Sequence, residues 1–231
     1  MRAQNILTQN KKMYIKECLA EGATNYSHFL TGKVFLIICD DCTERTIRFF
    51  KKDYIHLTGI KSNVSDDDFF TLCKKRKLAD GNIFTRQYYN WSTLKGKAVR
   101  IKDIHKIVYA DVKESLFIFD LHTNTADFPV AIRNSTRNTC VGFIDNIHKA
   151  RTLRKYSNSG NSECEKKIAA IFARPTSQTK YNELVYISNV YDIYTSDNAL
   201  IHKLSNSLRN RLTHILKNKV EGEVNPVGKK K

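Results

Sequence analysis

The alternation of hydrophobic and polar positions divides the first third of the chain into helix-like and strand-like stretches. Residues 9–21, QNKKMYIKECLAE, place apolar residues at three- and four-residue spacing before Gly22, a pattern that predicts a helix. Two β-rich runs, KVFLIIC from Lys33 and TIRFF from Thr46, flank the polar stretch DDCTER, which predicts a β-hairpin. The second run continues directly into the segment YIHLTGI, which we expect to be a strand that ends in a turn.

A second helix is predicted from Ser65, which is a suitable N-cap residue. Acidic residues fill its first turn and basic residues its last, in agreement with the helix dipole (Asp66, Asp67 and Asp68; Lys74, Lys75, Arg76 and Lys77). Residues 82–98 have no clear period, and we interpret them as a loop or a short helix.

The pattern changes from Ile104 onwards, where strand-like segments alternate with polar turns. Five segments fit this description: 105–112, 115–122, 127–134, 140–145 and 182–188. The polar stretch 157–162 between them is interpreted as a flexible loop. A helical half followed by a sheet half predicts an α+β fold, with helices packed on one face of an antiparallel sheet.

The last regular element is predicted to be one amphipathic helix in residues 198–217, because apolar residues recur on one face at helical spacing. This face either docks on its own domain or holds a partner subunit in a homodimer. We therefore predict one main domain in residues 1–195, a C-terminal helix in 196–218 and a disordered basic tail in 219–231.

Composition narrows the class of partner. The 231 residues carry a formal net charge of +16 spread through the chain, which favours a polyanion, and nucleic acid before an anionic membrane. Six scattered cysteines indicate reduced thiols and a cytoplasmic location, and the pair Cys39 and Cys42 lacks the second pair of ligands that a structural zinc site needs. No apolar run approaches the length of a membrane helix, so we expect a soluble protein that binds no metal and no membrane.

The sequence lacks the motifs of several enzyme classes. Phosphate-binding glycine loops, dinucleotide fingerprints, zinc-protease helices and nucleophile elbows are all missing, and no cofactor is predicted. The remaining imidazoles, cations and hydroxyls suit RNA cleavage without metal. In that reaction the 2′-hydroxyl attacks the neighbouring phosphate and leaves a cyclic phosphate, which selects RNA in preference to DNA.

The segment FFKKDYIHLTGIKS resembles phage-encoded nucleases of the barnase, EndoU, colicin and RelE-like (BECR) fold. The resemblance depends on an aromatic-rich stretch before His-Leu-Thr-Gly and an aromatic pair in the next helix (Phe50, Tyr54, His56, Leu57, Thr58, Gly59; Phe69 and Phe70). It extends more loosely from about residue 10 to residue 190. It implies a small α+β domain, ribonuclease activity of toxin or effector type and an inhibitor protein as a partner.

Candidate site residues follow from this chemistry, and each has a structural alternative. His56 is the first choice for proton transfer and His122 for a complementary acid, while Thr58 and Arg133 are placed to hold phosphate. The residues expected to contact nucleic acid are Lys51, Lys52, Lys61, Arg137, Lys180 and Tyr181. Each of these residues is also of a type that serves as a strand cap, a turn residue or a solvated charge.

Three hypotheses are compatible with these features. The leading one is a metal-independent endoribonuclease. The second is a non-catalytic RNA- or DNA-binding protein, which shares the charge but does not need His56. The third is an interaction protein of a phage or mobile element, in which a degenerate nuclease domain serves as a scaffold.

Overall fold

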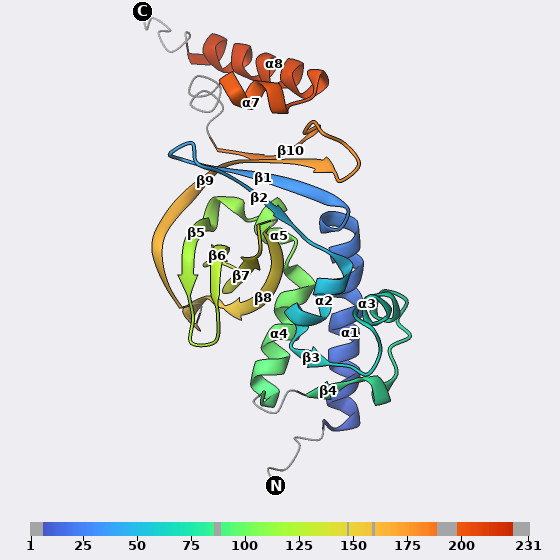
Figure 1. The fold of residues 1–231 in the computed structure, drawn as a ribbon. Helices are drawn as coiled ribbons and strands as arrows, with labels where there is room; N and C mark the ends of the chain where they lie inside the picture. Colours follow the sequence, from blue (N-terminus) through green and yellow to red (C-terminus); the bar gives the residue numbers. More distant parts are fainter. Residues whose placement is uncertain (1–6, 86–88, 147, 159, 189–197, 224–231) are drawn as a thin grey trace, which may run out of the picture.

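The computed structural model describes residues 7–85, 89–146, 148–158, 160–188 and 198–223. The predicted N-terminal helix is confirmed as α1 (Gln9–Asn25), which passes into a π-helical turn at Tyr26–Leu30. The predicted hairpin is confirmed as β1 (Lys33–Cys39) and β2 (Glu44–Arg48), paired from Val34↔Arg48 to Ile38↔Glu44. Figure 1 shows α1 beside the barrel-like sheet to which this hairpin belongs.

Short helices connect the hairpin to the rest of the sheet. A 3-10 turn (Lys51–Asp53), α2 (Tyr54–Thr58) and α3 (Asp66–Lys74) are followed by a 3-10 turn (Asp80–Asn82), α4 (Trp91–Asp103), α5 (Lys106–Tyr109) and another 3-10 turn (Val112–Glu114). Two short strands, β3 (Ile60–Lys61) and β4 (Phe84–Thr85), pair with each other. The predicted cap of α3 is confirmed, because the Ser65 hydroxyl accepts a hydrogen bond from the Asp68 amide at 3.1 Å.

The remaining strands are β5 (Ser115–His122), β6 (Asp127–Asn134), β7 (Thr139–Ile144), β8 (Lys149–Lys155), β9 (Asn161–Pro175) and β10 (Glu183–Ile187), with a 3-10 turn at Tyr156–Asn158. The sheet order is β1-β2-β8-β7-β6-β5-β9-β10, and an additional β1–β9 pairing closes it into a barrel-like form. All pairings are antiparallel except β2–β8, which is parallel and consists of the single pair Arg48↔Lys149. The α+β class is therefore confirmed, but the predicted antiparallel sheet is not, since this sheet closes on itself and includes a parallel pair.

Several segments have a secondary structure that differs from the one predicted from their local hydrophobic and polar pattern. Residues 105–112 form α5 and a 3-10 turn instead of a strand, because a short apolar run such as Ile107–Val108 fits a buried helix equally well. The stretch 157–162 was expected to be a loop, yet it contains the start of β9, whose polar half pairs with β5. The hairpin β1–β2 also shares one sheet with β5–β10, so helices α2–α5 lie between strands of one sheet in the chain, whereas α1 precedes that sheet.

The segment YIHLT is helical, although its residues favour strands. Tyr54, Ile55 and Leu57 are buried, and the Tyr54 hydroxyl donates a hydrogen bond to the Leu19 carbonyl of α1 at 2.7 Å. Gly59 ends the helix in the left-handed region at φ 77°. Packing against α1 therefore overrides the β-propensity of this stretch.

The predicted C-terminal helix is two helices, α7 (Asn198–Lys203) and α8 (Asn206–Glu223), which form a separate layer above β1, β9 and β10 (Figure 1). The break occurs because Tyr181 takes the backbone groups at the junction: its amide donates to the Lys203 carbonyl at 2.9 Å and its carbonyl accepts from the Ser205 amide at 2.8 Å. The predicted domain boundary at 195 lies outside the described residues, as do residues 224–231 of the predicted tail. Residues 219–223 of that tail were expected to be disordered but belong to α8.

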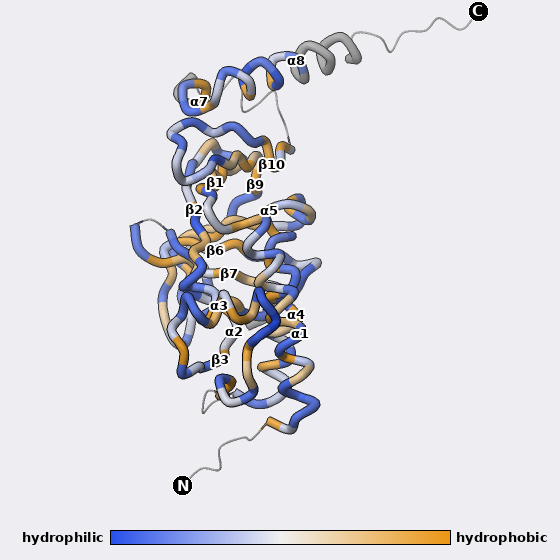
Figure 2. Tube along the Cα trace, turned by 90° about the vertical axis from the view of Figure 1, so that its right-hand side faces the viewer, coloured by the Kyte–Doolittle hydropathy of each residue, from blue (hydrophilic) through white to orange (hydrophobic). Residues whose placement is uncertain are grey.

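Two hydrophobic clusters hold the layers together. The larger fills the space between the sheet and helices α1–α5. The smaller joins four leucines of the C-terminal layer to the sheet residues Leu36, Ile38 and Phe172 (Leu200, Leu204, Leu208 and Leu212). Figure 2 shows the apolar positions concentrated along the strands between the two helical layers. The described part of the C-terminal stripe therefore packs on its own sheet, which is the first of the two alternatives that the sequence left open.

Leu208→Ala tests this packing. Leu208 is 3% exposed, so truncation should lower the free energy of unfolding by about 2–5 kcal/mol through lost burial and a cavity. Thermal unfolding measures the loss, and size-exclusion chromatography should show an unchanged oligomeric state. Met13→Ala, at a 53% exposed position, is the control with an expected change within about 0.5 kcal/mol. Dissociation of a dimer by Leu208→Ala would show instead that the stripe is an interface.

Candidate nucleic-acid interface

The residues of the His-Leu-Thr-Gly segment have different surroundings. His56 is a quarter exposed, and its Nε2 atom lies 3.6 Å from the Asp66 Oδ2 atom of α3. Thr58 is buried, and its hydroxyl donates to the Ile55 carbonyl at 2.7 Å and accepts from the Ile60 amide at 3.1 Å. The Thr58 hydroxyl thus completes the end of α2, whereas His56 remains accessible to a ligand.

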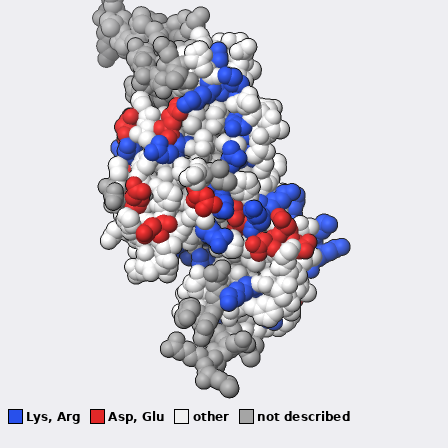
Figure 3. Space-filling model, in the orientation of Figure 1, with Lys and Arg blue, Asp and Glu red and all other residues white. Residues whose placement is uncertain are grey.

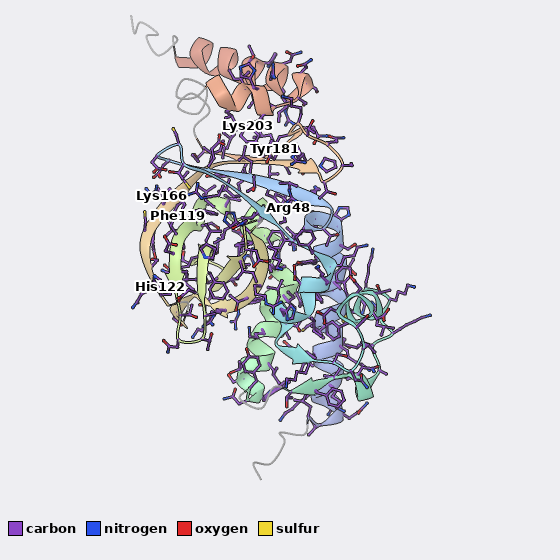
Figure 4. The ribbon with its side chains drawn as sticks, viewed as in Figure 1. Arg48, Phe119, His122, Lys166, Tyr181 and Lys203 are labelled. Atoms are coloured by element: carbon purple, nitrogen blue, oxygen red, sulfur yellow. The ribbon has the colours of Figure 1, made fainter. Side chains whose placement is uncertain are left out.

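Arg133 and His122 lie away from α2. Arg133 is 9% exposed, forms an ion pair with Glu165 and donates to the Gly160 carbonyl at 3.1 Å. His122 ends β5 with its Nδ1 atom 3.1 Å from the Asp127 Oδ1 atom, and it lies across the barrel from α2 (Figures 1 and 4). The four predicted catalytic residues therefore do not form one cluster.

Three of the predicted nucleic-acid contacts stabilise the fold. The Arg137 Nε atom lies 2.5 Å from an Asp111 carboxylate oxygen, which raises the pKa of the guanidinium above its ordinary value. Lys180 donates a hydrogen bond to the His202 carbonyl, and Tyr181 is buried below the C-terminal layer (Figure 4). Lys51, Lys52 and Lys61 are exposed, and the first two line a cavity of about 430 Å³.

A larger cavity, of about 590 Å³, lies between α4, β8 and the β5–β6 turn. Its lining combines cations, hydroxyls and one aromatic ring: Lys97, Arg100, Arg154 and Lys155; Ser92, Thr93, Thr125 and Thr152; Tyr89; and also Gly96 and Leu153. No Asp or Glu is among the described residues that line it. We refer to this cavity as the basic pocket, since its composition suits an anion such as a phosphate.

The sequence of α4 builds one wall of the basic pocket through helical spacing. The Asn90 side chain caps the helix by accepting from the Thr93 amide at 2.9 Å. Thr93, Lys97 and Arg100 then follow at four- and three-residue intervals, so they share one face. Gly96 lies on this face as well, and a Cβ atom there would be 2.9 Å from an Arg100 guanidinium nitrogen. A larger residue at position 96 would displace that guanidinium.

The other wall is an edge of β8. Because β2 pairs with β8 only at Lys149, the rest of β8 has no strand of the sheet on that side, and α4 packs there. Lys97 is 7% exposed and donates a hydrogen bond to the Leu153 carbonyl, and its ammonium lies 5.7 Å from the centroid of the Tyr89 ring. These contacts hold a buried cation at the back of the basic pocket.

The two arginines of the basic pocket have buried Nε atoms. Arg154 donates to the Thr125 hydroxyl, but the Nε atoms of Arg100 and Arg154 are buried and have no hydrogen-bond partner among the described residues. Burial lowers the pKa of Arg100 below its ordinary value, because the charged form loses hydration. A guanidinium stays protonated in spite of such a shift, so both residues keep a positive charge in the lining of the basic pocket.

Gly59 links the predicted segment to the basic pocket. A Cβ atom at this position would lie 2.6 Å from the Lys97 Cδ atom and 2.7 Å from the Tyr89 Cε2 atom. His56 is three residues before Gly59, and its side chain lies next to Asp66 of α3. The sequence analysis selected this segment but none of the residues that line the basic pocket. The available signal was the spacing of Thr93, Lys97 and Arg100, in a region read as a loop or short helix.

On the face shown in Figure 3, basic side chains lie among acidic ones and do not form one continuous patch, so overall charge alone does not locate the site. Within the described ranges, no three side chains of His, Cys, Asp and Glu lie close enough to hold a metal ion. No helix in that same part of the chain has the length and apolar character needed to cross a membrane.

Gly59→Ala tests the packing at the rim of the basic pocket. An alanine would pay the cost of a left-handed backbone, about 1–2 kcal/mol, and would also collide with Lys97 and Tyr89. Gly32→Ala has only the backbone cost, because Gly32 has φ 75° and nothing lies within 4 Å of the added methyl. Gly81→Ala has neither the backbone cost nor a collision. Thermal unfolding should rank the losses as Gly59 above Gly32 above Gly81. Equal losses at Gly59 and Gly32 would refute the close approach.

Comparison with known proteins identifies a family. The family model described as phage-Barnase-EndoU-ColicinE5/D-RelE like nuclease4 (PBECR4) matches residues 18–221, which include α2, α4, β8 and the whole basic pocket. No curated protein and no solved structure matches the chain. Since the match spans most of the sequence, the chain belongs to the PBECR4 family of phage-related nucleases.

Proposed function

We propose that the protein is a metal-independent endoribonuclease and that the basic pocket binds the scissile phosphate. The observation that carries this proposal is the concentration of Lys97, Arg100, Arg154 and Lys155 around one cavity whose described lining contains no carboxylate. Membership of a nuclease family supplies the substrate class, a nucleic acid.

The chemistry requires charge stabilisation at the phosphate. When the 2′-hydroxyl attacks, negative charge builds on the phosphorane oxygens, and donors already oriented toward them lower the barrier. Arg100 and Arg154 line the basic pocket, and we assign this role to their guanidinium groups. The 5′-oxygen of the next nucleotide leaves as a hydroxyl, and the product is a 2′,3′-cyclic phosphate. DNA lacks the attacking group and would bind without being cleaved.

His56 is the proposed proton-transfer group. It is partly exposed, precedes Gly59 by one turn, and has the Asp66 carboxylate 3.6 Å from its Nε2 atom. A carboxylate next to an imidazole orients the ring and stabilises its protonated form. Thr58, Arg133 and His122 are not part of the proposed site, because Thr58 is buried, Arg133 belongs to β6 and His122 is at the end of β5.

We also propose a toxin or effector role in the cytoplasm. Unrestricted cleavage of cellular RNA harms the cell that makes the enzyme, so a protein inhibitor is the expected partner. The resemblance of the segment from Phe49 to Ser62 to phage-encoded nucleases supports this role.

A non-catalytic nucleic-acid-binding protein is the second candidate. The observation that favours it is that none of the described residues lining the basic pocket is a histidine, an aspartate or a glutamate. The residues that line the basic pocket therefore account for the binding of an anion. Catalysis would require a proton-transfer residue from outside that lining, such as His56.

Arg154→Gln is the first test of the proposed function. The purified chain should cleave total RNA in EDTA and leave cyclic phosphate ends, and the substitution should reduce the rate by about 10²- to 10³-fold, the usual loss for one oriented donor. Lys113→Gln, at an exposed position outside the basic pocket, is the matched control and should cleave normally. Cleavage that appears only when a divalent metal is added would overturn the mechanism. Binding without any cleavage would support the second candidate.

His56→Ala separates catalysis at the rim of the basic pocket from binding within it. Cleavage should fall by about two to four orders of magnitude, the range for loss of a general acid or base. Affinity for RNA with a 2′-O-methyl group at each ribose, which blocks attack, should change little because the pocket cations remain. The melting temperature is the control for folding. Normal cleavage by His56→Ala would remove His56 from the mechanism.

A further inference from the structure

A second basic cavity, of about 430 Å³, lies where β2 ends and the 3-10 turn Lys51–Asp53 begins. Its cations include Arg48, Lys51 and Lys52, and the ring of Phe50 also lines it. Lys33 lines it too, but the Lys33 ammonium is held by Glu183 at 2.8 Å. Asp67 is the acidic residue among its described lining.

Arg48 contributes a positive charge to the lining of this second cavity. Its Nε atom is buried and has no hydrogen-bond partner among the described residues, as for the arginines of the basic pocket. Lys51 and Lys52 are exposed beside it. Both cavities therefore combine arginine and lysine side chains with an aromatic residue on which a base can stack.

Strand β8 connects the two cavities. Its first residue, Lys149, pairs with Arg48 of the second cavity, and its last residues, Arg154 and Lys155, line the basic pocket. Six residue steps in a strand span about 20 Å. The two cavities are therefore separated by more than one nucleotide but lie within reach of a short oligonucleotide.

The side chains along β8 form a basic path between the cavities. Ala150 and Leu153 are both in the core although they are three positions apart, because a bulge opposite Gly142/Phe143 changes the register there. Arg151 is exposed as a result. Desolvation raises the pKa of the buried Asp53 carboxyl above its ordinary value, and Lys149, Arg151 and Lys52 lie close enough to oppose part of this rise.

Acidic residues also lie near this path. Asp145 forms an ion pair with Lys149 at 2.6 Å, and Asp53 is 3% exposed. Cations nevertheless outnumber acids from one cavity to the other, and Arg151, Lys51 and Lys52 are exposed to an incoming phosphate.

We propose that single-stranded RNA lies along β8, with one phosphate in the basic pocket and another in the Arg48–Lys51–Lys52 cavity. The identity of the substrate rests on the proposed function, whereas the path itself follows from the geometry. A single strand is favoured over a duplex because each cavity pairs its cations with an aromatic ring, and only unpaired bases can stack on side chains in this way. The protein should thus prefer oligonucleotides that span both cavities.

The test is the length dependence of binding in a Lys51→Gln/Lys52→Gln double variant. Fluorescence anisotropy with 2′-O-methyl RNA compares a dinucleotide with a strand of about 10 nucleotides, a length within the usual range of single-strand sites. The double variant should bind the longer strand at least tenfold more weakly. Its loss for the dinucleotide should be much smaller. The salt slope for the longer strand should fall by about 0.7 for each phosphate contact removed.

The controls separate a specific path from general charge. A Lys113→Gln/Lys167→Gln variant removes the same charge from exposed positions that line neither cavity and should reproduce parent binding. Arg48→Gln, checked for folding by its melting temperature, should reproduce the length-dependent loss. Equal losses for both probe lengths, equal losses in the control, or equally tight binding of duplex RNA would each overturn the proposal.

The outcome is independent of catalysis. A chain that fails to cleave RNA in EDTA but shows the length-dependent loss would keep the binding path and lose the ribonuclease function. A chain that cleaves dinucleotides and long strands equally well, with no effect of the double variant, would keep the ribonuclease function and lose the path.

Discussion

The contact between α4 and the edge of β8 is the constraint on which the site depends. The barrel-like sheet is closed by β1–β9 on one side, but β2 and β8 meet at a single residue pair, so most of that edge of β8 has no neighbouring strand. Unpaired backbone groups of a buried edge cost free energy, and Lys97 offsets part of this cost by donating to the Leu153 carbonyl. The same bond fixes α4, and α4 in turn places Arg100 opposite Arg154 across the basic pocket. The contact that covers the edge of β8 therefore also positions the residues of the basic pocket.

The large positive charge of the chain has two distinct uses. Some cations are neutralised inside the fold: Arg133 by Glu165, Arg137 by Asp111 and Lys203 by Glu44. These pairs orient strands and dock the C-terminal layer, and a ligand would have to break them to use the charge. The cations at the two cavities are different, since their lining is poor in carboxylates. Net charge in the sequence indicated a polyanionic partner, but only the pairing of individual residues distinguishes structural cations from those available for binding.

The elements that are determined by residues close together in the sequence were predictable from the sequence. The hairpin β1–β2, the Ser65 cap of α3 and the strands β5, β6 and β7 follow from local pattern and were predicted. Strands β8 and β9 were both missed. The first half of β9 is polar, and pairing with β5, far away in the chain, makes it a strand. Tyr181 was expected to stack on RNA, but it pairs with Leu204 and divides the C-terminal helix in two. The basic pocket was missed for the same reason, since Lys97 and Arg154 are brought together by long-range packing that no local period encodes.

The conformation of Gly59 explains why the segment YIHLTGI is packed against the basic pocket although none of its residues lines that pocket. Its positive φ ends α2, and its missing side chain leaves room for both Lys97 and Tyr89. The cations that line the basic pocket repel one another, so their mutual repulsion destabilises the folded protein. A bound phosphate replaces that repulsion with attraction, and the free energy gained is then shared between ligand affinity and stability of the α4–β8 contact. Binding at the basic pocket and closure of the barrel edge should therefore strengthen each other, because both act through the position of Lys97.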